Sequence, residues 1–178
     1  MYWENIEGYF NFQNIYTGVV QSYPSGSTFV EIGAYKGKSA VYMAEEIIKS
    51  KKDITFWAVD TFEGTKDEQH DEDFFEEFLA NIEPVKMNIK FHKEDSKQAY
   101  KRYEDNSIDF LFIDGDHTYK GVKADLTNWY PKVKQGGIIA GHDYAEPTCG
   151  VKMAVDQYFL FTGIIQNGTS WIVKKQNY

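Results

Sequence analysis

Apolar and polar positions along the 178-residue chain follow two alternating patterns. Short apolar runs predict buried strands, and stretches in which apolar residues recur every three or four positions predict amphipathic helices. Because the two patterns follow each other repeatedly, we expect a parallel sheet with helices on both faces. The predicted strands are residues 29–32, 54–59, 88–91, 108–113, 138–140, 161–165 and 169–173.

Helices are predicted between these strands and before the first of them. Asn167 and Gly168 separate the last two strands and give the strongest short signal for a tight antiparallel hairpin. We therefore expect one α/β domain over residues 1–178, with a mostly parallel seven-stranded sheet that ends in an antiparallel hairpin. The predicted helical segments are 3–10 and 15–23 within an N-terminal region of residues 1–25, then 40–48, 74–82, 96–103 and a helix that begins near Tyr119.

The first strand runs directly into a glycine turn that opens a helix. Gly33 and Gly37 let the backbone turn tightly and approach a ligand, which then faces the N-terminus of the helix. This spacing differs from the Gly-x-Gly-x-x-Gly of dinucleotide binders, whose close-set glycines cradle a pyrophosphate. The alternative for this segment alone is a strand–turn–helix unit without a ligand.

The second predicted strand ends in Asp60, beside the first glycine turn if the strands are parallel. An acid in this place accepts hydrogen bonds from ribose hydroxyls, although Asp60 can also simply cap the following turn. Glu31 in place of a third glycine, together with Asp60, resembles the cofactor site of class I methyltransferases. The resemblance implies an S-adenosylmethionine site formed by Glu31, Gly33, Gly37, Ser39 and Asp60, with Asp114 after the fourth predicted strand also at the cofactor.

The composition fits one globular domain and excludes some functions. Hydrophobic residues make up 42% of the chain, enough for one core, and the net charge of −8 argues against a nucleic-acid partner. No apolar run approaches membrane-spanning length, and the first residues lack the features of a signal peptide. The single cysteine, Cys149, fits a reducing compartment. We therefore expect a cytoplasmic protein with no membrane partner.

Residues 61–87 form an insertion after the second predicted strand. It contains an acidic run at residues 67–73 and then apolar residues at helical spacing. Because it follows the carboxyl end of a strand, we expect it to act as a lid or an acceptor-binding wall. The alternative is that the acids are solvated and the apolar residues are ordinary core. These apolar residues are Phe74, Phe75, Phe78, Leu79 and Ile82.

A second group of polar residues follows the fourth and fifth predicted strands. Asp114 comes directly after one apolar strand, and His142 and Asp143 come after the next. Neighbouring parallel strands would bring them together at the same rim as the cofactor. Carboxylate and imidazole ligands suit a divalent metal, which offsets the repulsion between the acids. Asp116 or Thr118 can instead have the simpler role of capping the next helix.

The motifs DGDHTY (residues 114–119) and GHDY (residues 141–144) resemble those of macrocin-type and macrolide-sugar O-methyltransferases. They are similar, more loosely, to those of the catechol and caffeoyl-CoA enzymes. The resemblance spans roughly residues 29–144. It implies that Asp114, His142 and Asp143 hold a magnesium ion and that His117 is the general base. Here His142 replaces the first acid of the family's pair, which favours transition metals over magnesium.

The same resemblance implies that Asp95 and Ser96, after the third strand, contact adenine, although either residue can simply cap a helix. We predict O-methylation of a small-molecule hydroxyl with divalent-metal assistance, for which Asp114 and His117 are the catalytic residues. A metal-dependent phosphoesterase and a non-catalytic S-adenosylmethionine-binding protein stay open, and an NAD-dependent dehydrogenase is disfavoured by the glycine spacing. The acceptor and the presence of a homo-oligomer are not determined by the sequence.

Overall fold

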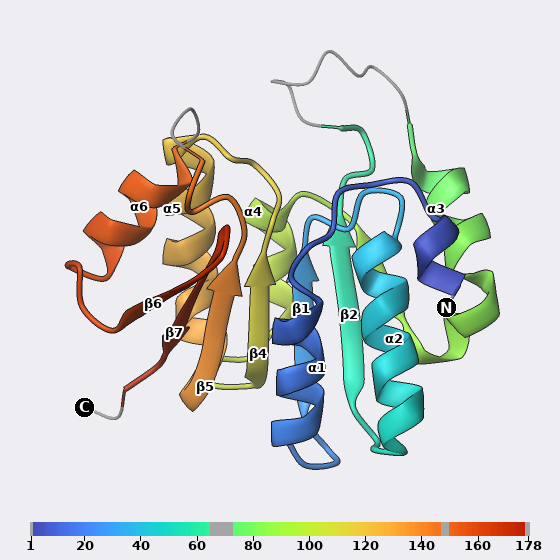
Figure 1. Ribbon diagram of the computed structural model, residues 1–178. Helices are drawn as coiled ribbons and strands as arrows, with labels where there is room; N and C mark the ends of the chain where they lie inside the picture. The colour runs from blue at the N-terminus through green and yellow to red at the C-terminus, as the bar shows by residue number, and fades with distance from the viewer. Residues whose placement is uncertain (1, 65–72, 147–149, 177–178) are drawn as a thin grey trace.

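A seven-stranded sheet forms the centre of the computed structural model, which describes residues 2–64, 73–146 and 150–176 (Figure 1). The strand order is β3-β2-β1-β4-β5-β7-β6, with β7 antiparallel to β5 and β6 antiparallel to β7. The other pairs are parallel. The predicted α/β fold with a terminal hairpin is therefore confirmed. The strands are β1 (Thr28–Ile32), β2 (Thr55–Asp60), β3 (Lys90–Lys93), β4 (Ile108–Ile113), β5 (Val133–Gly141), β6 (Ile164–Asn167) and β7 (Ser170–Lys174).

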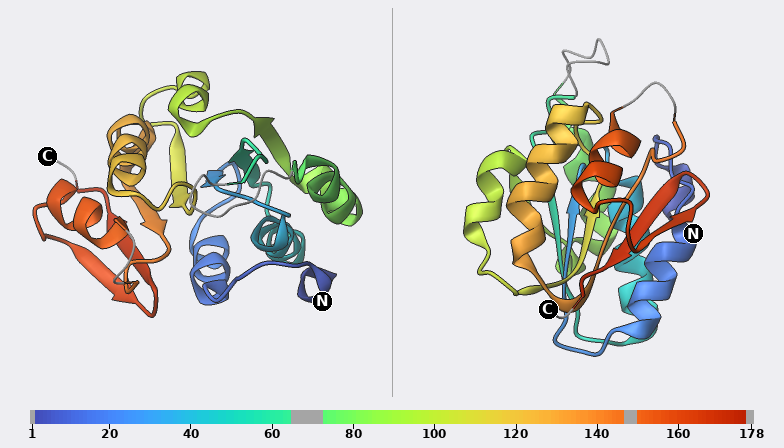
Figure 2. Two further views of the ribbon diagram at one scale, coloured as in Figure 1. Left: turned by 90° about the horizontal axis from the view of Figure 1, so that it is seen from above. Right: turned by 90° about the vertical axis from the view of Figure 1, so that its left-hand side faces the viewer.

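Helices cover both faces of the sheet, as the view from above shows (Figure 2). One layer contains η1 (Tyr2–Asn5), α1 (Gln13–Ser22), α2 (Lys38–Ser50), α3 (Phe75–Ile82) and η2 (Glu83–Asn88). The other contains α4 (Ser96–Ala99), η3 (Tyr100–Arg102), α5 (Tyr119–Trp129), η4 (Tyr130–Lys132) and α6 (Val151–Tyr158). No helix within the described ranges is long and apolar enough to cross a membrane.

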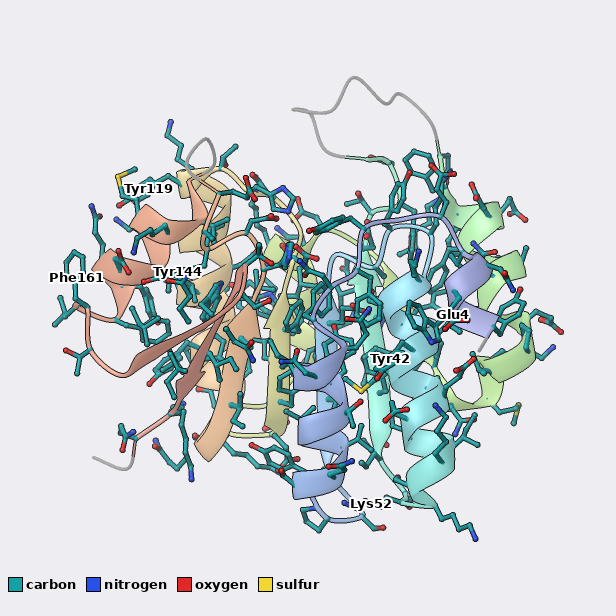
Figure 3. All side chains as sticks on the ribbon, viewed as in Figure 1. Glu4, Tyr42, Lys52, Tyr119, Tyr144 and Phe161 are labelled. Carbon is teal, nitrogen blue, oxygen red and sulfur yellow. The ribbon has the colours of Figure 1, made fainter. Side chains whose placement is uncertain are left out.

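The central strands are apolar on both sides because both sides are covered. Successive side chains point to opposite faces, so Phe110 and Phe112 of β4 join the core with α1 and α2, whereas Leu111 and Ile113 join the core with α5 and α6. The N-terminal helix α1 is also tied to α2 by a 2.7 Å hydrogen bond between Thr17 Oγ1 and the Tyr42 hydroxyl (Figure 3).

Several predicted boundaries are wrong for local reasons. The predicted strand at residues 161–165 starts too early, because Phe161 has a positive φ angle and is exposed, so β6 begins only at Ile164. The 3₁₀ helix η2 delays β3 by two residues. Gly136 and Gly137 lie inside β5 instead of before it, and α6 has no counterpart in the predicted elements.

The apolar stripe of the 61–87 insertion is core. Phe74, Phe78 and Ile82 are 4%, 0% and 2% exposed, and the Phe78 ring lies 4.5 Å from that of Phe62 and 5.6 Å from that of Phe91. This favours the packing alternative for the stripe. Residues 67–72 of the acidic run, like Cys149, lie outside the described residues, and the lid role of the insertion stays a prediction.

We predict that Phe78→Ala lowers the free energy of unfolding by about 3–5 kcal/mol, because it removes a fully buried ring and leaves a cavity. Urea denaturation measures this change. The control is Met87→Ala, whose side chain is 89% exposed, and it should alter stability by less than about 0.5 kcal/mol. If both variants have the unfolding free energy of the wild type, packing of α3 does not contribute to the stability of the core.

Candidate active site

The register of the parallel strands brings the predicted site residues to one rim of the sheet. Ile32 of β1 lies opposite Val59 of β2 and Ile113 of β4, and Ile113 lies opposite Gly141 of β5. The next residue along each strand therefore lies at the same carboxyl edge. These residues are Gly33, Asp60, Asp114 and His142.

The glycine turn after β1 requires both of its glycines. Gly33 has a φ of +87°, and a Cβ there would lie 2.1 Å from the Asp114 carbonyl oxygen. Gly37 has a φ of +90° and precedes the first turn of α2, where a Cβ would lie 3.1 Å from the Phe78 ring. A side chain at either position would be strained, and at Gly33 it would also separate the turn from the loop after β4.

Asp60 holds the glycine turn in place. Its Oδ2 accepts hydrogen bonds from the Ala34 and Tyr35 backbone N–H groups at 2.7 and 2.8 Å, and its Oδ1 accepts one from Phe62 N–H at 2.8 Å. The turn-capping alternative is therefore present in the structure. Because a carboxylate offers about four lone-pair directions, Oδ1 retains capacity for a ligand hydroxyl.

Glu31 is a fully buried carboxyl group on the face of β1 that α1 covers. The Tyr16 hydroxyl donates to its Oε1 at 2.7 Å, whereas Oε2 has no hydrogen-bond partner in the described part of the chain. Burial raises the pKa of Glu31 to about 8, although the hydroxyls of Ser39 and Tyr16 oppose this. An unpaired buried oxygen of this kind suits a positively charged group of a bound cofactor.

Lys36, within the glycine turn, binds two other parts of the chain. Its Nζ lies 2.8 Å from Glu7 Oε2 in the N-terminal segment and 3.0 Å from Glu77 Oε2 in α3. Asn81 of α3 also donates to the Lys36 carbonyl oxygen at 2.8 Å. Hydrogen bonds to the two carboxylates raise the pKa of Lys36, so its charge is retained.

Asp114, His117, His142 and Asp143 form a cluster, which we call the acid–imidazole cluster. His117 Nε2 lies 3.2 Å from Asp143 Oδ2 and 3.5 Å from Asp114 Oδ1. His142 Nδ1 lies 3.1 Å from Asp143 Oδ1 and 3.8 Å from Asp114 Oδ1. The two carboxylates thus lie between two imidazoles. The three strand-end residues expected to meet, Asp114, His142 and Asp143, come together, and His117 joins them from the loop after β4.

The backbone at Asp143 is unusual. It has a φ of +57°, in the left-handed region that aspartate adopts more readily than most residues. Burial alone would raise the pKa of Asp143, but its hydrogen bond with His142 and the nearby charge of His117 lower it. Asp143 is therefore held as a carboxylate in a conformation that turns it toward both imidazoles.

His142 is buried and its ring is held at both nitrogens. Nε2 lies 2.9 Å from Asn11 Oδ1 and 2.7 Å from Thr169 Oγ1, while Nδ1 faces Asp143. Burial lowers the pKa of His142, but the hydrogen bond to Asp143 and the charges of Asp143 and Asp114 outweigh this and raise it.

The acid–imidazole cluster has the donor set of a divalent-cation site. Ligand atoms of Asp114, His117 and Asp143 all lie within 4.8 Å of one another, and His142 Nδ1 faces the same two carboxylates. Two carboxylates without a cation between them repel each other, and mixed oxygen and imidazole donors suit divalent metals. The residues therefore fit a metal ion.

The predicted adenine contacts lie at the start of α4. Asp95 accepts a 2.8 Å hydrogen bond from Lys97 N–H and so caps this helix. Ser96 Oγ donates to Asp125 Oδ1 at 2.6 Å, and burial raises the pKa of Asp125 to about 6. The capping alternative is realised for Asp95, and the contact with adenine stays a prediction.

Four residues around the site were not predicted from the sequence: Asn11, Tyr16, Lys36 and Thr169. Each acts through a partner far away in the chain, so no local pattern marks it. Lys36 lies inside the predicted glycine turn, but its partners Glu7 and Glu77 are also remote in the chain.

A cavity lies close to Tyr144, the residue that follows the acid–imidazole cluster. It has a volume of about 690 Å³ and opens between α6 and β6, where Tyr144, Lys152 and Phe161 line it. Figure 3 shows Tyr144 and Phe161 on this side of the molecule. Its lining shares no residue with the glycine turn or the acid–imidazole cluster, so we do not assign it to the cofactor.

Residues 30–144 match the family described as methyltransferase domain, and the chain therefore belongs to this family. The matched range includes the glycine turn, Asp60 and the whole acid–imidazole cluster. The resemblance inferred from the sequence motifs is confirmed at the level of family and fold.

Known relatives agree with this assignment. Demethyldecarbamoylnovobiocin O-methyltransferase from Streptomyces niveus is 28% identical over 153 residues, which are 72% of this chain and 56% of that protein. The solved structure of the O-methyltransferase NovP has a TM-score of 0.74 at 22% identity, covering 93% of this chain and 80% of that one. CalS11, a calicheamicin methyltransferase, has a TM-score of 0.67 at 15% identity, covering 92% and 77%. The chain spans about half the length or less of the curated relatives it matches.

We predict that Glu31 makes stability depend on pH. Its pKa is about 8 in the folded protein against an ordinary value of 4.5, so the folded state binds this proton more tightly. The contribution is complete well below pH 4.5 and is lost as the pH rises through about 8. Between about pH 5 and 8, the wild type should lose roughly 2–4 kcal/mol more unfolding free energy than Glu31→Gln. Parallel pH dependence of the two proteins in urea denaturation would contradict a protonated Glu31.

Proposed function

We propose that the protein transfers the methyl group of S-adenosylmethionine to a hydroxyl of a small-molecule acceptor, with a divalent cation at Asp114, His142 and Asp143. The observation that carries the proposal is the contact between Gly33 and the Asp114 backbone. Through it, the cofactor-type glycine turn directly adjoins the acid–imidazole cluster. A phosphoesterase would have no use for such a turn, so this adjacency favours methyl transfer.

On the cofactor side, we infer the contacts from carboxylate oxygens that can still accept a hydrogen bond or face a positive charge. Glu31 Oε2 is buried without a hydrogen-bond partner in the described chain and would face a positive group of the cofactor. Asp60 Oδ1 would accept a ribose hydroxyl while Oδ2 keeps the turn in place. S-adenosylmethionine supplies an electrophilic methyl group, so the protein has chiefly to align the acceptor and exclude water.

On the acceptor side, the two histidines have different proposed roles. The His142 side chain is 4% exposed, and its second nitrogen is held by Asn11 and Thr169, as is usual for a metal-ligating histidine. The His117 side chain is 33% exposed and meets the distances for a ligand as well. Because it faces solvent, where an acceptor enters, we assign His117 Nε2 to take the proton of the acceptor hydroxyl.

A cation at Asp114, His142 and Asp143 would lower the pKa of a hydroxyl close to it and help to position the acceptor. The acceptor class is suggested by the relatives. One is named for a novobiocin precursor, and a second CalS11 structure is described as a TDP-rhamnose 3'-O-methyltransferase. We therefore propose a sugar or phenol hydroxyl as the acceptor.

The cofactor assignment predicts binding of S-adenosylhomocysteine, measured by calorimetry. Asp60→Asn should weaken it by about 1–3 kcal/mol, because a charge-assisted hydrogen bond to the ribose is lost. Asp53, an exposed acid just before the opposite end of β2, provides the matched control, and Asp53→Asn should bind like the wild type. Thermal melting of each variant separates lost binding from a disturbed turn. If the wild type does not bind, the methyltransferase proposal is wrong.

The metal assignment predicts that Asp114→Asn abolishes Mn²⁺ binding and metal-stimulated methyl transfer while cofactor affinity changes by less than about threefold. The reason is that Asp114 offers its carboxylate to the cluster and only its backbone to the glycine turn. Transfer to TDP-rhamnose and to catechol can be followed by mass spectrometry, with Asp116→Asn as the neighbouring control. Transfer that survives both EDTA and Asp114→Asn would remove the cation from the mechanism.

A further inference from the structure

The N-terminal segment packs the rings of Tyr9 and Phe12 against His142 and makes its hydrogen bond to this imidazole through Asn11. Its Oδ1 lies 2.9 Å from His142 Nε2. Its Nδ2 donates to the Tyr9 hydroxyl at 2.9 Å and to Thr169 Oγ1 at 3.1 Å. Thr169, in the two-residue turn between β6 and β7, contacts both His142 and Asn11. Two segments 158 residues apart thus meet at one imidazole nitrogen.

This network determines which nitrogen of His142 carries the proton. The Asn11 amide is oriented by its two donated hydrogen bonds, so its oxygen faces Nε2. An amide oxygen can only accept, and Nε2 must therefore carry a hydrogen. In the neutral ring, Nδ1 then has the free lone pair.

The lone pair on Nδ1 points toward negative charge. Nδ1 lies 3.1 Å from Asp143 Oδ1 and 3.8 Å from Asp114 Oδ1. A lone pair facing two carboxylates is repulsive, and a positive charge between the three groups relieves this: a proton between Nδ1 and Asp143, which agrees with the raised pKa of His142, or a metal ion in its place. The same orientation is what a metal-ligating imidazole needs, with its other N–H held by an acceptor.

We propose that Asn11, supported by Thr169, is a positioning residue that fixes the His142 ring with Nδ1 toward Asp114 and Asp143. The N-terminal segment therefore completes the cation site although it supplies no ligand. This inference rests on the proposed function only in requiring a cation at the acid–imidazole cluster.

Asn14 is a matched control that distinguishes positioning of the His142 ring from simple attachment of the N-terminal segment to the hairpin. Asn14 lies three residues further on, is exposed like Asn11, and bonds the same hairpin turn through Nδ2 to Asn167 Oδ1 at 3.3 Å. It makes no contact with His142 among the hydrogen bonds of the described chain. Loss of Asn14 removes a tether between the same two segments and leaves the imidazole held.

The test is titration of the purified protein with Mn²⁺, followed by electron paramagnetic resonance of the free ion. Asn11→Ala should weaken Mn²⁺ binding by about 10–100-fold, the usual effect of removing the hydrogen-bond partner of a metal-ligating histidine. Asn11→Asp keeps an oxygen toward Nε2 and should restore binding to at least the wild-type level. Asn14→Ala should bind Mn²⁺ like the wild type, and S-adenosylhomocysteine affinity should be unchanged in all three variants.

Each contrary outcome has a separate meaning. Equal Mn²⁺ affinity in Asn11→Ala and the wild type overturns the positioning role and leaves the cation site intact. Equal losses in Asn11→Ala, Asn11→Asp and Asn14→Ala also overturn it, because the contact would then be a general tether. A wild-type protein that binds S-adenosylhomocysteine but no Mn²⁺ overturns the cation site and this inference together, while the cofactor assignment stands.

Discussion

The site depends on the tight contact between Gly33 and the backbone of Asp114. Only a residue without a side chain allows it, since a Cβ would lie 2.1 Å from the Asp114 carbonyl oxygen. The contact joins the turn after β1 to the loop after β4, and a hydrogen bond from Asp114 N–H to the Ile32 carbonyl at 2.8 Å supports it. The proposed electrophile and the proposed nucleophile would each be placed by one of these loops, so their separation depends on backbone packing.

Burial and neighbouring groups shift the pKa values of two carboxyl groups in this site, Glu31 and Asp143, in opposite directions. Glu31 has only hydroxyl partners in a fully buried place, and its pKa rises to about 8. Asp143 lies between two imidazoles, and its pKa falls. Glu31 is therefore largely protonated at neutral pH when the site is empty, whereas Asp143 keeps its negative charge.

The sequence predicted those parts of the fold and site that depend on neighbouring positions in the chain. Strand cores, the glycine turn, the hairpin and the strand-end residues Asp60, Asp114, His142 and Asp143 follow from periodicity and from the rule that parallel strands end at one rim. The start of the predicted strand 161–165 was wrong because apolar character does not indicate the φ angle, and Phe161 lies in a turn with a positive φ. Asn11 and Thr169 were missed because their roles exist only through contacts between distant segments, which local patterns do not encode.

Lys36 joins the glycine turn to two carboxylates through a single positive charge. One ammonium group cannot neutralise both Glu7 and Glu77, so the three side chains together retain a negative charge. The two carboxylates repel each other, and departure of one strengthens the attraction that the other feels. Attachment of the N-terminal segment to Lys36 therefore weakens the attachment of α3 to the same residue, and the reverse also holds. The effect is small because both glutamates are exposed. One of the two ion pairs can therefore break while the other still anchors the glycine turn.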